Sequence, residues 1–99
     1  MVSENPKISI ITVCFNAQNV IETCIQSVLS QTYLNTEYVI VDGQSTDGTL
    51  SIIHKYKDRI AKIISEKDNG IYDALNKGIQ RATGDIIGFV LSYDTNSSF

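Results

Sequence analysis

The sequence predicts an α/β fold, a Rossmann-like three-layer α/β/α arrangement around a mostly parallel sheet. The first supporting observation is a set of apolar runs rich in β-branched residues, which is typical of strands covered on both faces. The second is that the stretches between these runs repeat apolar residues at helical spacing. Because strands and helices alternate along the chain, right-handed crossovers would make the strands parallel. We expect one domain over residues 1–99, with the usual doubly wound strand order 3-2-1-4.

The first element is the run KISIITVC, which predicts a strand at residues 8–14. A helix should begin at Asn19, because Asn19 and Glu22 have the spacing of a capping box and an apolar stripe follows as far as Leu29. After the second strand, DGQSTDGT predicts a turn, and the second helix begins after this turn. The elements after the first helix are a strand in EYVIVD, a helix in LSIIHKYK, a strand in AKIISE, a helix in GIYDALNKGIQRATG and a strand in DIIGFVL.

Composition and charge exclude several classes of protein. The net charge of −3 at pH 7 argues against a nucleic-acid partner, which would require a clustered Lys/Arg face. No apolar stretch approaches the roughly 20 residues that span a bilayer, and MVSENPK lacks the apolar core of a signal peptide. We therefore expect a cytoplasmic chain, in which Cys14 and Cys24 are reduced, buried thiols.

Polar and aromatic residues gather where the predicted strands end. In an open parallel sheet, ligands bind outside the carboxyl ends of the strands. Carboxylates from several strands repel one another there unless a cation compensates them, so this edge favours Mn²⁺ or Mg²⁺. CFNAQN contains no glycine-rich phosphate loop, so a pyrophosphate would need such a metal, with Asp94 as its anchor. The residues at these strand ends are Phe15, Asn16, Asp42, Glu66, Asp68 and Asp94.

Three of the polar or aromatic residues also have structural interpretations. Asp47 precedes a glycine and favours a helix cap. Phe15 could present its ring to a flat base or could pack in the core. His54 is the only histidine and has no carboxylate or cysteine at metal-ligand spacing, so we expect a surface residue.

Three segments, in collinear order, resemble the amino-terminal half of glycosyltransferase family 2. They are PKISIITVCFNAQNVIETCIQSVLSQTY, YVIVDGQSTDGT and SEKDNGIYDALNKGIQRATGDIIGF, and together they cover nearly the whole chain. The resemblance implies the GT-A fold and the transfer of a sugar from a nucleoside diphosphate donor with inversion at the anomeric carbon. The form of SEKDNGIYDALNKGI looks like the branch that builds bacterial exopolysaccharide and capsule.

Site residues follow from this resemblance, position by position. Phe15 matches the aromatic residue that faces the nucleobase, commonly uracil. Asp42 matches an acid that reads the base or ribose, and Asp68 matches a polar position that lines the donor pocket. Asp94 matches the last acid of the DXD-type motif, which resembles a metal ligand. The first-strand motif adds the remaining nucleotide-binding candidates, Thr12, Cys14 and Asn16.

The chain departs from the family pattern at several positions. Many members have a second acid after Asp42 where this chain has Gly43, and the usual NSDD is here LSYD, so that Leu91 and Tyr93 replace an amide and a carboxylate. No residue matches the general base that deprotonates the acceptor hydroxyl. We therefore assign no catalytic residue and expect a truncated chain that binds a UDP-sugar without transferring it, and that lies at the inner face of the membrane in a full-length form.

Two other functions remain open at this point. A degenerate GT-A-like module would bind a nucleotide or a protein partner and transfer nothing, which Tyr93 favours. A phosphoacceptor receiver domain also places acids and a metal at strand ends, but it would need a fifth strand with a lysine. If the strand order is 3-2-1-4, the last strand, DIIGFVL, lies at the edge of the sheet as an apolar stretch without a proline or lysine, so we expect a homo-oligomer through this edge. A glycan or lipid-linked acceptor would not bind this fragment alone.

Overall fold

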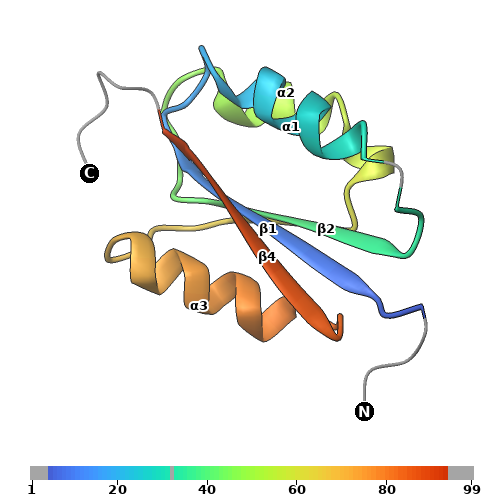
Figure 1. Ribbon diagram of the computed structural model, residues 1–99. Coiled ribbons are helices and arrows are strands. Elements are labelled where there is room, and N and C mark those ends of the chain that lie inside the picture. Colours follow the sequence, from blue (N-terminus) through green and yellow to red (C-terminus); the bar gives the residue numbers. More distant parts are fainter. Residues whose placement is uncertain (1–4, 32, 94–99) are drawn as a thin grey trace.

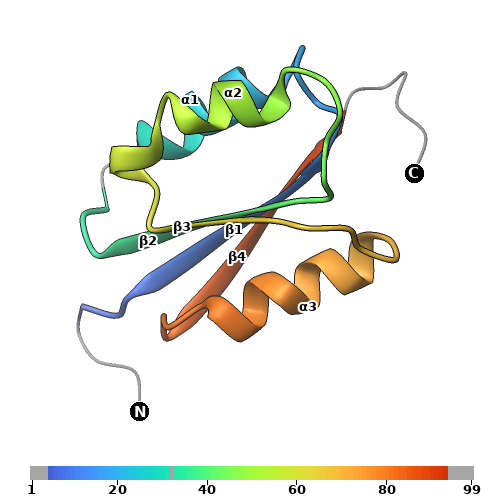
Figure 2. The same ribbon diagram turned by 180° about the vertical axis from the view of Figure 1, so that it is seen from behind.

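The computed structural model describes residues 5–31 and 33–93. Within them, four parallel strands form one sheet in the order β3-β2-β1-β4, which confirms the predicted order (Figure 1). The helices α1 and α2 cover one face of this sheet and α3 covers the other, giving the predicted three layers (Figure 2). The strands are β1 (Ile8–Phe15), β2 (Thr36–Asp42), β3 (Lys62–Ser65) and β4 (Ile86–Tyr93), and the helices are α1 (Ile21–Leu29), α2 (Thr49–His54), a 3₁₀ turn (Lys57–Arg59) and α3 (Ile71–Arg81).

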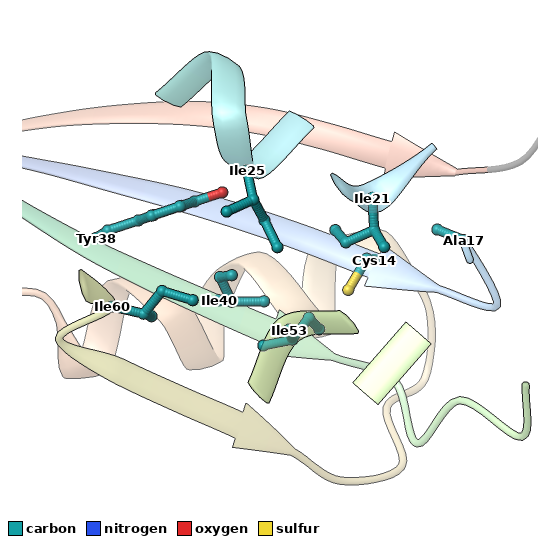
Figure 3. Close-up of a cluster of buried hydrophobic side chains, with 8 residues drawn as sticks. All are labelled: Cys14, Ala17, Ile21, Ile25, Tyr38, Ile40, Ile53 and Ile60. Carbon is teal, nitrogen blue, oxygen red and sulfur yellow. The ribbon is translucent and has the colours of Figure 1, made fainter. Parts of the chain in front are cut away.

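The hydrophobic core is divided by the sheet into two clusters of side chains. Alternate residues of β2 point to opposite faces, so Tyr38 and Ile40 pack under α1 and α2 while Val39 and Val41 pack under α3. The first cluster is drawn in Figure 3 and consists of Cys14, Ala17, Ile21, Ile25, Tyr38, Ile40, Ile53 and Ile60. β1 and β2 are thus covered on both faces, as their continuous apolar runs predict.

A close approach between α3 and the sheet depends on Gly78. A Cβ atom at this position would lie 2.5 Å from Cγ2 of Ile11 and 3.4 Å from Cγ2 of Val41. Only a glycine lets the helix backbone pack at this depth without a shift of the strand side chains. The site described below lies at the amino-terminal end of this helix.

The capping box predicted at Asn19 is wrong. α1 begins at Ile21 with Val20 as its N-cap, and no side-chain hydrogen bond caps it. The side chain of Glu22 is used elsewhere, because Oη of Tyr56 donates to its Oε2 at 2.6 Å and Nζ of Lys55 lies 3.2 Å from the same atom. Glu22 therefore fastens α1 to the segment that follows α2.

α3 stops at Arg81, three residues before the glycine that ends the predicted helical run. Ala82 is already extended, with ψ at 141°. The backbone N–H of Thr83 donates to Oε1 of the buried Glu37 at 2.9 Å, and that of Gly84 donates to Oγ of Ser9 at 2.8 Å. These bonds, from the start of β1 and β2, turn the chain out of the helix and into β4.

Glu37 is a buried carboxylate that holds this turn. Its Oε1 also accepts from Oγ of Ser9 at 2.8 Å, and its Oε2 lies 3.5 Å from Nζ of Lys62. Burial opposes its ionisation, but the hydrogen bonds from Thr83 and Ser9 and the charge of Lys62 outweigh burial and lower the pKa of Glu37 to about 2. This network lies at the amino-terminal edge of the sheet, opposite the candidate site.

The two cysteines are free, as predicted, and Cys14 is buried, but the prediction of a buried thiol is wrong for Cys24, which is half-buried. None of the helices in the described part of the chain has the length and apolar character needed to cross a membrane.

Candidate functional site

An open pocket of about 810 Å³ lies at the carboxyl ends of β1, β2 and β3, beside the start of α3. This is the edge of a parallel sheet where ligands bind, because the crossover loops diverge there. The pocket is lined by Phe15, Gly43, Gln44, Thr46, Lys67, Asp68, Asn69, Gly70, Ile71 and Tyr72. Its size suits a small organic ligand.

Two aromatic side chains line the pocket. Phe15, the last residue of β1, is half-buried, whereas the four residues before it on β1 are buried in the core. Part of its ring therefore faces the pocket. Tyr72, in the first turn of α3, is 85% exposed. A flat ring could therefore stack on either side chain, and the pocket combines these apolar surfaces with polar loop residues.

Asp68 places a carboxylate against the floor of the pocket. Its Oδ1 accepts from the backbone N–H of Gly70 at 3.2 Å. Its Oδ2 is buried and has no hydrogen-bond partner among the described residues. A Cβ atom on Gly43 would lie 2.9 Å from this Oδ2 and 3.3 Å from Cδ1 of Phe15, so the absence of a side chain at position 43 makes room for both neighbours.

Asp42 faces inward rather than into the pocket. It is fully buried, and its Oδ2 accepts from the backbone N–H of Ser45 at 2.8 Å and from Oγ of Ser65 at 3.0 Å. Its Oδ1 accepts from Oγ of Ser45 and, at 3.6 Å, from the thiol of Cys14. Asp42 therefore holds the loop after β2 in place; direct contact with a base or ribose stays a prediction.

Asn16 supports the same loop from β1. Its φ of 46° turns the backbone after the strand, its N–H donates to Oγ of Ser45 at 2.8 Å, and its Oδ1 accepts from the N–H of Thr46 at 2.8 Å. Gln44 also has a positive φ, of 67°. The wall of the pocket formed by residues 43–46 is thus fixed by hydrogen bonds from two strand ends.

Thr12 and Cys14 lie below the pocket, in the core. Oγ1 of Thr12 is 2.8 Å from Oη of Tyr38. Burial, followed by the nearby charge of Asp42, raises the pKa of Cys14 far above its ordinary value, so this thiol stays protonated. The structure thus places these two predicted residues beneath the loop residues, where contact with a ligand would be indirect.

The loop of residues 66–70, of which residues 67–70 line the pocket, is tied to α3 by two side chains, Lys77 and Asp73, that the sequence analysis does not assign to the site. Nζ of Lys77 donates to the backbone carbonyl of Lys67 at 2.7 Å and lies 3.3 Å from Oε1 of Glu66. Oδ2 of Asp73 accepts from the N–H of Asn69 at 2.9 Å. Asp73 and Lys77 also pair with each other at i, i+4, a spacing that could have signalled them.

Among the described residues, the carboxylates at the strand ends do not form a cluster suited to a metal ion. Asp42 is occupied by its own loop, and the described part of the chain contains no group of three side chains suited to hold a metal ion. Asp94, the predicted metal ligand, lies outside the described residues. The described residues alone do not make a metal centre, so the metal stays a prediction that rests on Asp94.

Of the two structural interpretations, that of His54 as a surface residue is confirmed, whereas the N-cap position of α2 is occupied by Gly48, with no side-chain cap bond, and Asp47 lies one residue before it. Oδ1 of Asp47 accepts from the N–H of Thr49 at 3.0 Å, at the start of α2, and its Oδ2 accepts from the N–H of Gln18 at 3.4 Å. Burial opposes the ionisation of Asp47, but hydrogen bonds from the hydroxyl and the N–H of Thr49 and from the N–H of Gln18 outweigh it and lower the pKa of Asp47. His54 is exposed at the end of α2, away from the residues that line the pocket.

Known proteins of similar sequence are glycosyltransferases. A teichuronic acid biosynthesis glycosyltransferase of Bacillus subtilis, TuaG, is 38% identical over 97 residues, which are 95% of this chain and 38% of that protein. A second relative from the same organism, EpsH, is 34% identical over 92% of this chain and 27% of its own length. The chain thus spans about a third of the length of these curated relatives.

Two solved structures of similar fold contain bound sugar nucleotides. The mannosyltransferase PcManGT from Pyrobaculum calidifontis, in complex with GDP-Man and Mn²⁺, matches with a TM-score of 0.78 and 29% identity over 86% of this chain and 27% of that chain. S. aureus TarS 1-349, in complex with UDP-GlcNAc, matches with a TM-score of 0.79 and 28% identity, and the match covers 86% of this chain and 26% of that chain. The sheet order and layers described above are therefore those of GT-A glycosyltransferases.

A family model reaches the same result over most of the chain. The model for glycosyl transferase family 2 matches residues 9–90, a range that runs from β1 into β4 and includes every residue lining the pocket. The chain belongs to glycosyltransferase family 2.

Proposed function

We propose that this chain binds a UDP-sugar and is the donor-binding part of an inverting glycosyltransferase that builds a bacterial polysaccharide. The observation that carries the proposal is the pocket at the carboxyl ends of β1–β3, with the ring of Phe15 and the carboxylate of Asp68 among its lining residues. TarS binds UDP-GlcNAc and PcManGT binds GDP-Man, which supports a nucleoside diphosphate sugar as the ligand class. The relative TuaG supports a polysaccharide as the product.

In this proposal the nucleobase stacks on Phe15, between the loop of residues 43–46 and the loop of residues 66–70. Both loops are held by hydrogen bonds in the ligand-free chain, so little ordering would accompany binding. The apolar ring supplies stacking, and the polar loop residues orient the base. Thr12, Cys14, Asn16 and Asp42 then act by supporting the loop and Phe15 from below.

A divalent cation, Mn²⁺ or Mg²⁺, would neutralise the diphosphate, which leaves with the nucleotide when the sugar is transferred. Asp94 is the residue we expect to hold it, because it is the next residue in the sequence after β4, and it matches the last acid of the family's DXD-type motif. PcManGT is solved in complex with GDP-Man and Mn²⁺, which supports a divalent cation as part of the donor complex.

Titration calorimetry with UDP, in Mn²⁺ and after chelation, tests the proposal. Phe15→Ala should weaken UDP binding by about 5- to 100-fold, the range expected for one lost base–aromatic stack. The control His54→Ala changes an exposed residue outside the pocket and should leave the affinity unchanged. Failure of the unmodified chain to bind UDP at millimolar concentration would reject donor binding.

Transfer of the sugar is proposed to need more of the protein than this chain. The chain spans 38% of TuaG and 26% of the TarS chain, and no residue in it matches the family's general base. The isolated 99-residue chain should therefore bind the donor and at most hydrolyse it slowly. Efficient transfer to an added acceptor by the pure chain would contradict this and direct the search for a base to Glu66, Asp68 and Asp73.

A non-catalytic nucleotide-binding module is the second candidate, favoured by Tyr93 where the family pattern has a carboxylate. The same titration separates the two candidates. Equal affinity for UDP with and without metal would favour the module, whereas a clear loss of affinity on chelation would favour the transferase.

A further inference from the structure

We propose that the groove between α1 and β4 binds an uncharged aliphatic alcohol, whose hydroxyl pairs with the side chain of Ser92. The groove shares no lining residue with the pocket at the carboxyl ends of β1–β3, so the proposal goes beyond donor binding and does not depend on it. It follows from three observations: the uncharged aliphatic lining of the groove, a buried hydroxyl without a partner, and a glycine that leaves the strand side open.

The groove has a volume of about 550 Å³, which is within the range of small-molecule sites. The described residues that line it include no charged and no aromatic side chain, and the apolar ones include Ile10, Val20, Val28 and Val90. A charged ligand would lose its water there without gaining a counter-charge. A flat aromatic ligand would find no ring to stack on. The lining therefore favours an uncharged aliphatic body.

The polar partner of the ligand is Ser92, on β4. This residue is only 4% exposed, and its Oγ is shut off from solvent and has no hydrogen-bond partner among the described residues. Ser92 is paired with Cys14, whose side chain lies in the cluster under α1, so the Ser92 side chain points to the same face of the sheet and lines the groove. A buried hydroxyl without a partner is costly. Because a hydroxyl both donates and accepts, a ligand hydroxyl can satisfy it in either direction.

Gly88 keeps the strand side of the groove open. It is paired with Ile10, which lines the groove, and it lies on the same face of β4 as Ser92 because side chains alternate along a strand. A Cβ atom on Gly88 would have no heavy atom within 4 Å apart from those of its chain neighbours. The stretch of β4 from Gly88 to Ser92 spans roughly 13 Å. An extended alkyl chain therefore fits this space better than a compact molecule does.

Cys24 lies in the wall of the groove and can report whether the groove is occupied. Its thiol is free and half-buried, and its Sγ lies 3.9 Å from Oγ1 of Thr12. A thiol reagent that enters the groove reaches Cys24, whereas Cys14 is buried. A bound alcohol would cover Cys24 and slow its reaction. Cys14 is the internal control, because its labelling would reveal unfolding.

The rate at which the uncharged reagent dithiodipyridine labels Cys24, located by peptide mass spectrometry, tests the proposal. We expect millimolar n-octanol to slow the labelling of the unmodified chain about 5-fold, the factor for a ligand present at about four times its Kd. Cys14 should stay unlabelled throughout. Octanoate has a similar chain but is charged at neutral pH, so it should not protect Cys24.

Ser92→Ala removes the hydroxyl that the ligand pairs with. It should weaken the binding of n-octanol about 2- to 10-fold, the range for one neutral hydrogen bond. It should not destabilise the chain, because the lost hydroxyl is unpaired. The matched control Ser51→Ala changes an exposed serine of α2, outside the groove, and should leave the protection of Cys24 unchanged.

Gly88→Leu is the second variant, because it places a side chain in the open space beside β4. It should abolish protection by n-octanol, and a thermal melt shows whether it remains folded. If it is unfolded, Ser92→Ala decides the test.

The proposal is overturned if n-octanol leaves the labelling rate unchanged, if octanoate protects Cys24 equally well, or if Ser92→Ala binds n-octanol as tightly as the unmodified chain does. Labelling that slows as the protein concentration rises, without alcohol, would also overturn it, because a second copy of the chain would then cover the groove. UDP should leave the labelling rate unchanged, so failure of the alcohol test leaves the proposed donor binding standing.

Discussion

At the scale of single residues, Glu37 shows how a buried charge can serve the fold. Because its pKa is about 2 in the folded chain and 4.5 ordinarily, ionised Glu37 stabilises the folded state fully above about pH 4.5. This stabilisation is lost as the pH falls toward 2, where the folded form also takes up the proton. The loss should detach the turn at Thr83 from β2.

Glu37→Gln should therefore lower the free energy of unfolding by about 1–3 kcal/mol at pH 7, and by less at pH 2.5, where the native carboxylate has lost most of its advantage. Urea unfolding at the two pH values measures both numbers. Glu66→Gln is the matched control, since the Glu66 carboxylate is half exposed and solvent screens its ion pair with Lys77. If Glu37→Gln lowers the free energy of unfolding equally at both pH values, the charge of the carboxylate does not contribute to stability.

The positions of some site residues, but not of all, could be predicted from the sequence. Phe15 and Asp68 follow strand ends and line the pocket, as the rule for parallel sheets predicts. Asp42 obeys the same rule yet turns inward, because the hydroxyls of Ser45 and Ser65 bind it, and such a tertiary contact leaves no periodic trace in the sequence. The carboxylate of Asp68 likewise lies against Gly43, which is 25 positions earlier in the sequence, so this contact exists only in the folded chain.

At the scale of elements, the packing of α3 on β1 and β2 depends on one glycine. Glycine in a helix usually costs about 1 kcal/mol relative to alanine, so Gly→Ala normally stabilises. At Gly78 the sign should reverse, because the new methyl group would meet Cγ2 of Ile11 at 2.5 Å. We expect Gly78→Ala to destabilise the chain by about 1–3 kcal/mol through overpacking.

Thermal or urea unfolding measures this change. Asn76→Ala is the control, because Asn76 is exposed on the same helix and its replacement should be neutral or slightly stabilising. A stabilised Gly78→Ala variant would mean that α3 can move away from the sheet at no cost.

Element types were predictable but some boundaries were not. The apolar period of α1 and the β-branched runs of the strands are local signals, and the structure has each of these elements near its predicted place. The start of α1 and the end of α3 are set by Glu22 and Glu37, which bind partners 34 and 46 residues away. Such contacts override the local capping signal, so boundaries are the part that sequence patterns predict least well.

At the scale of the whole molecule, the alternation of strands and helices predicts a parallel sheet, and the order 3-2-1-4, expected because it is the usual doubly wound order, is the one observed. That order leaves β4 at an edge, where, among the described residues, it pairs with β1 only. Four of its side chains are large, apolar and partly exposed: Ile86 at 43%, Ile87 at 37%, Phe89 at 49% and Leu91 at 52%. An apolar edge strand with no proline or lysine to blunt it can pair with another chain.

We therefore expect the isolated chain to form a dimer or larger assembly through β4, by strand addition or by burial of its exposed face. Size exclusion coupled to light scattering at micromolar concentration measures the assembly. Ile87→Lys places a charge on the face that carries Phe89 and Leu91, and it should shift the assembly toward monomer.

Leu34→Lys is the control, because Leu34 is 97% exposed and lies before β2, outside the edge strand. A monodisperse unmodified chain would show that this edge is protected. If Leu34→Lys dissociates the assembly as well as Ile87→Lys does, the contact lies elsewhere on the surface. If Ile87→Lys unfolds the chain, Phe89→Lys repeats the test at a more exposed position of the same strand, and an assembly that survives this charge would exclude β4 as the contact.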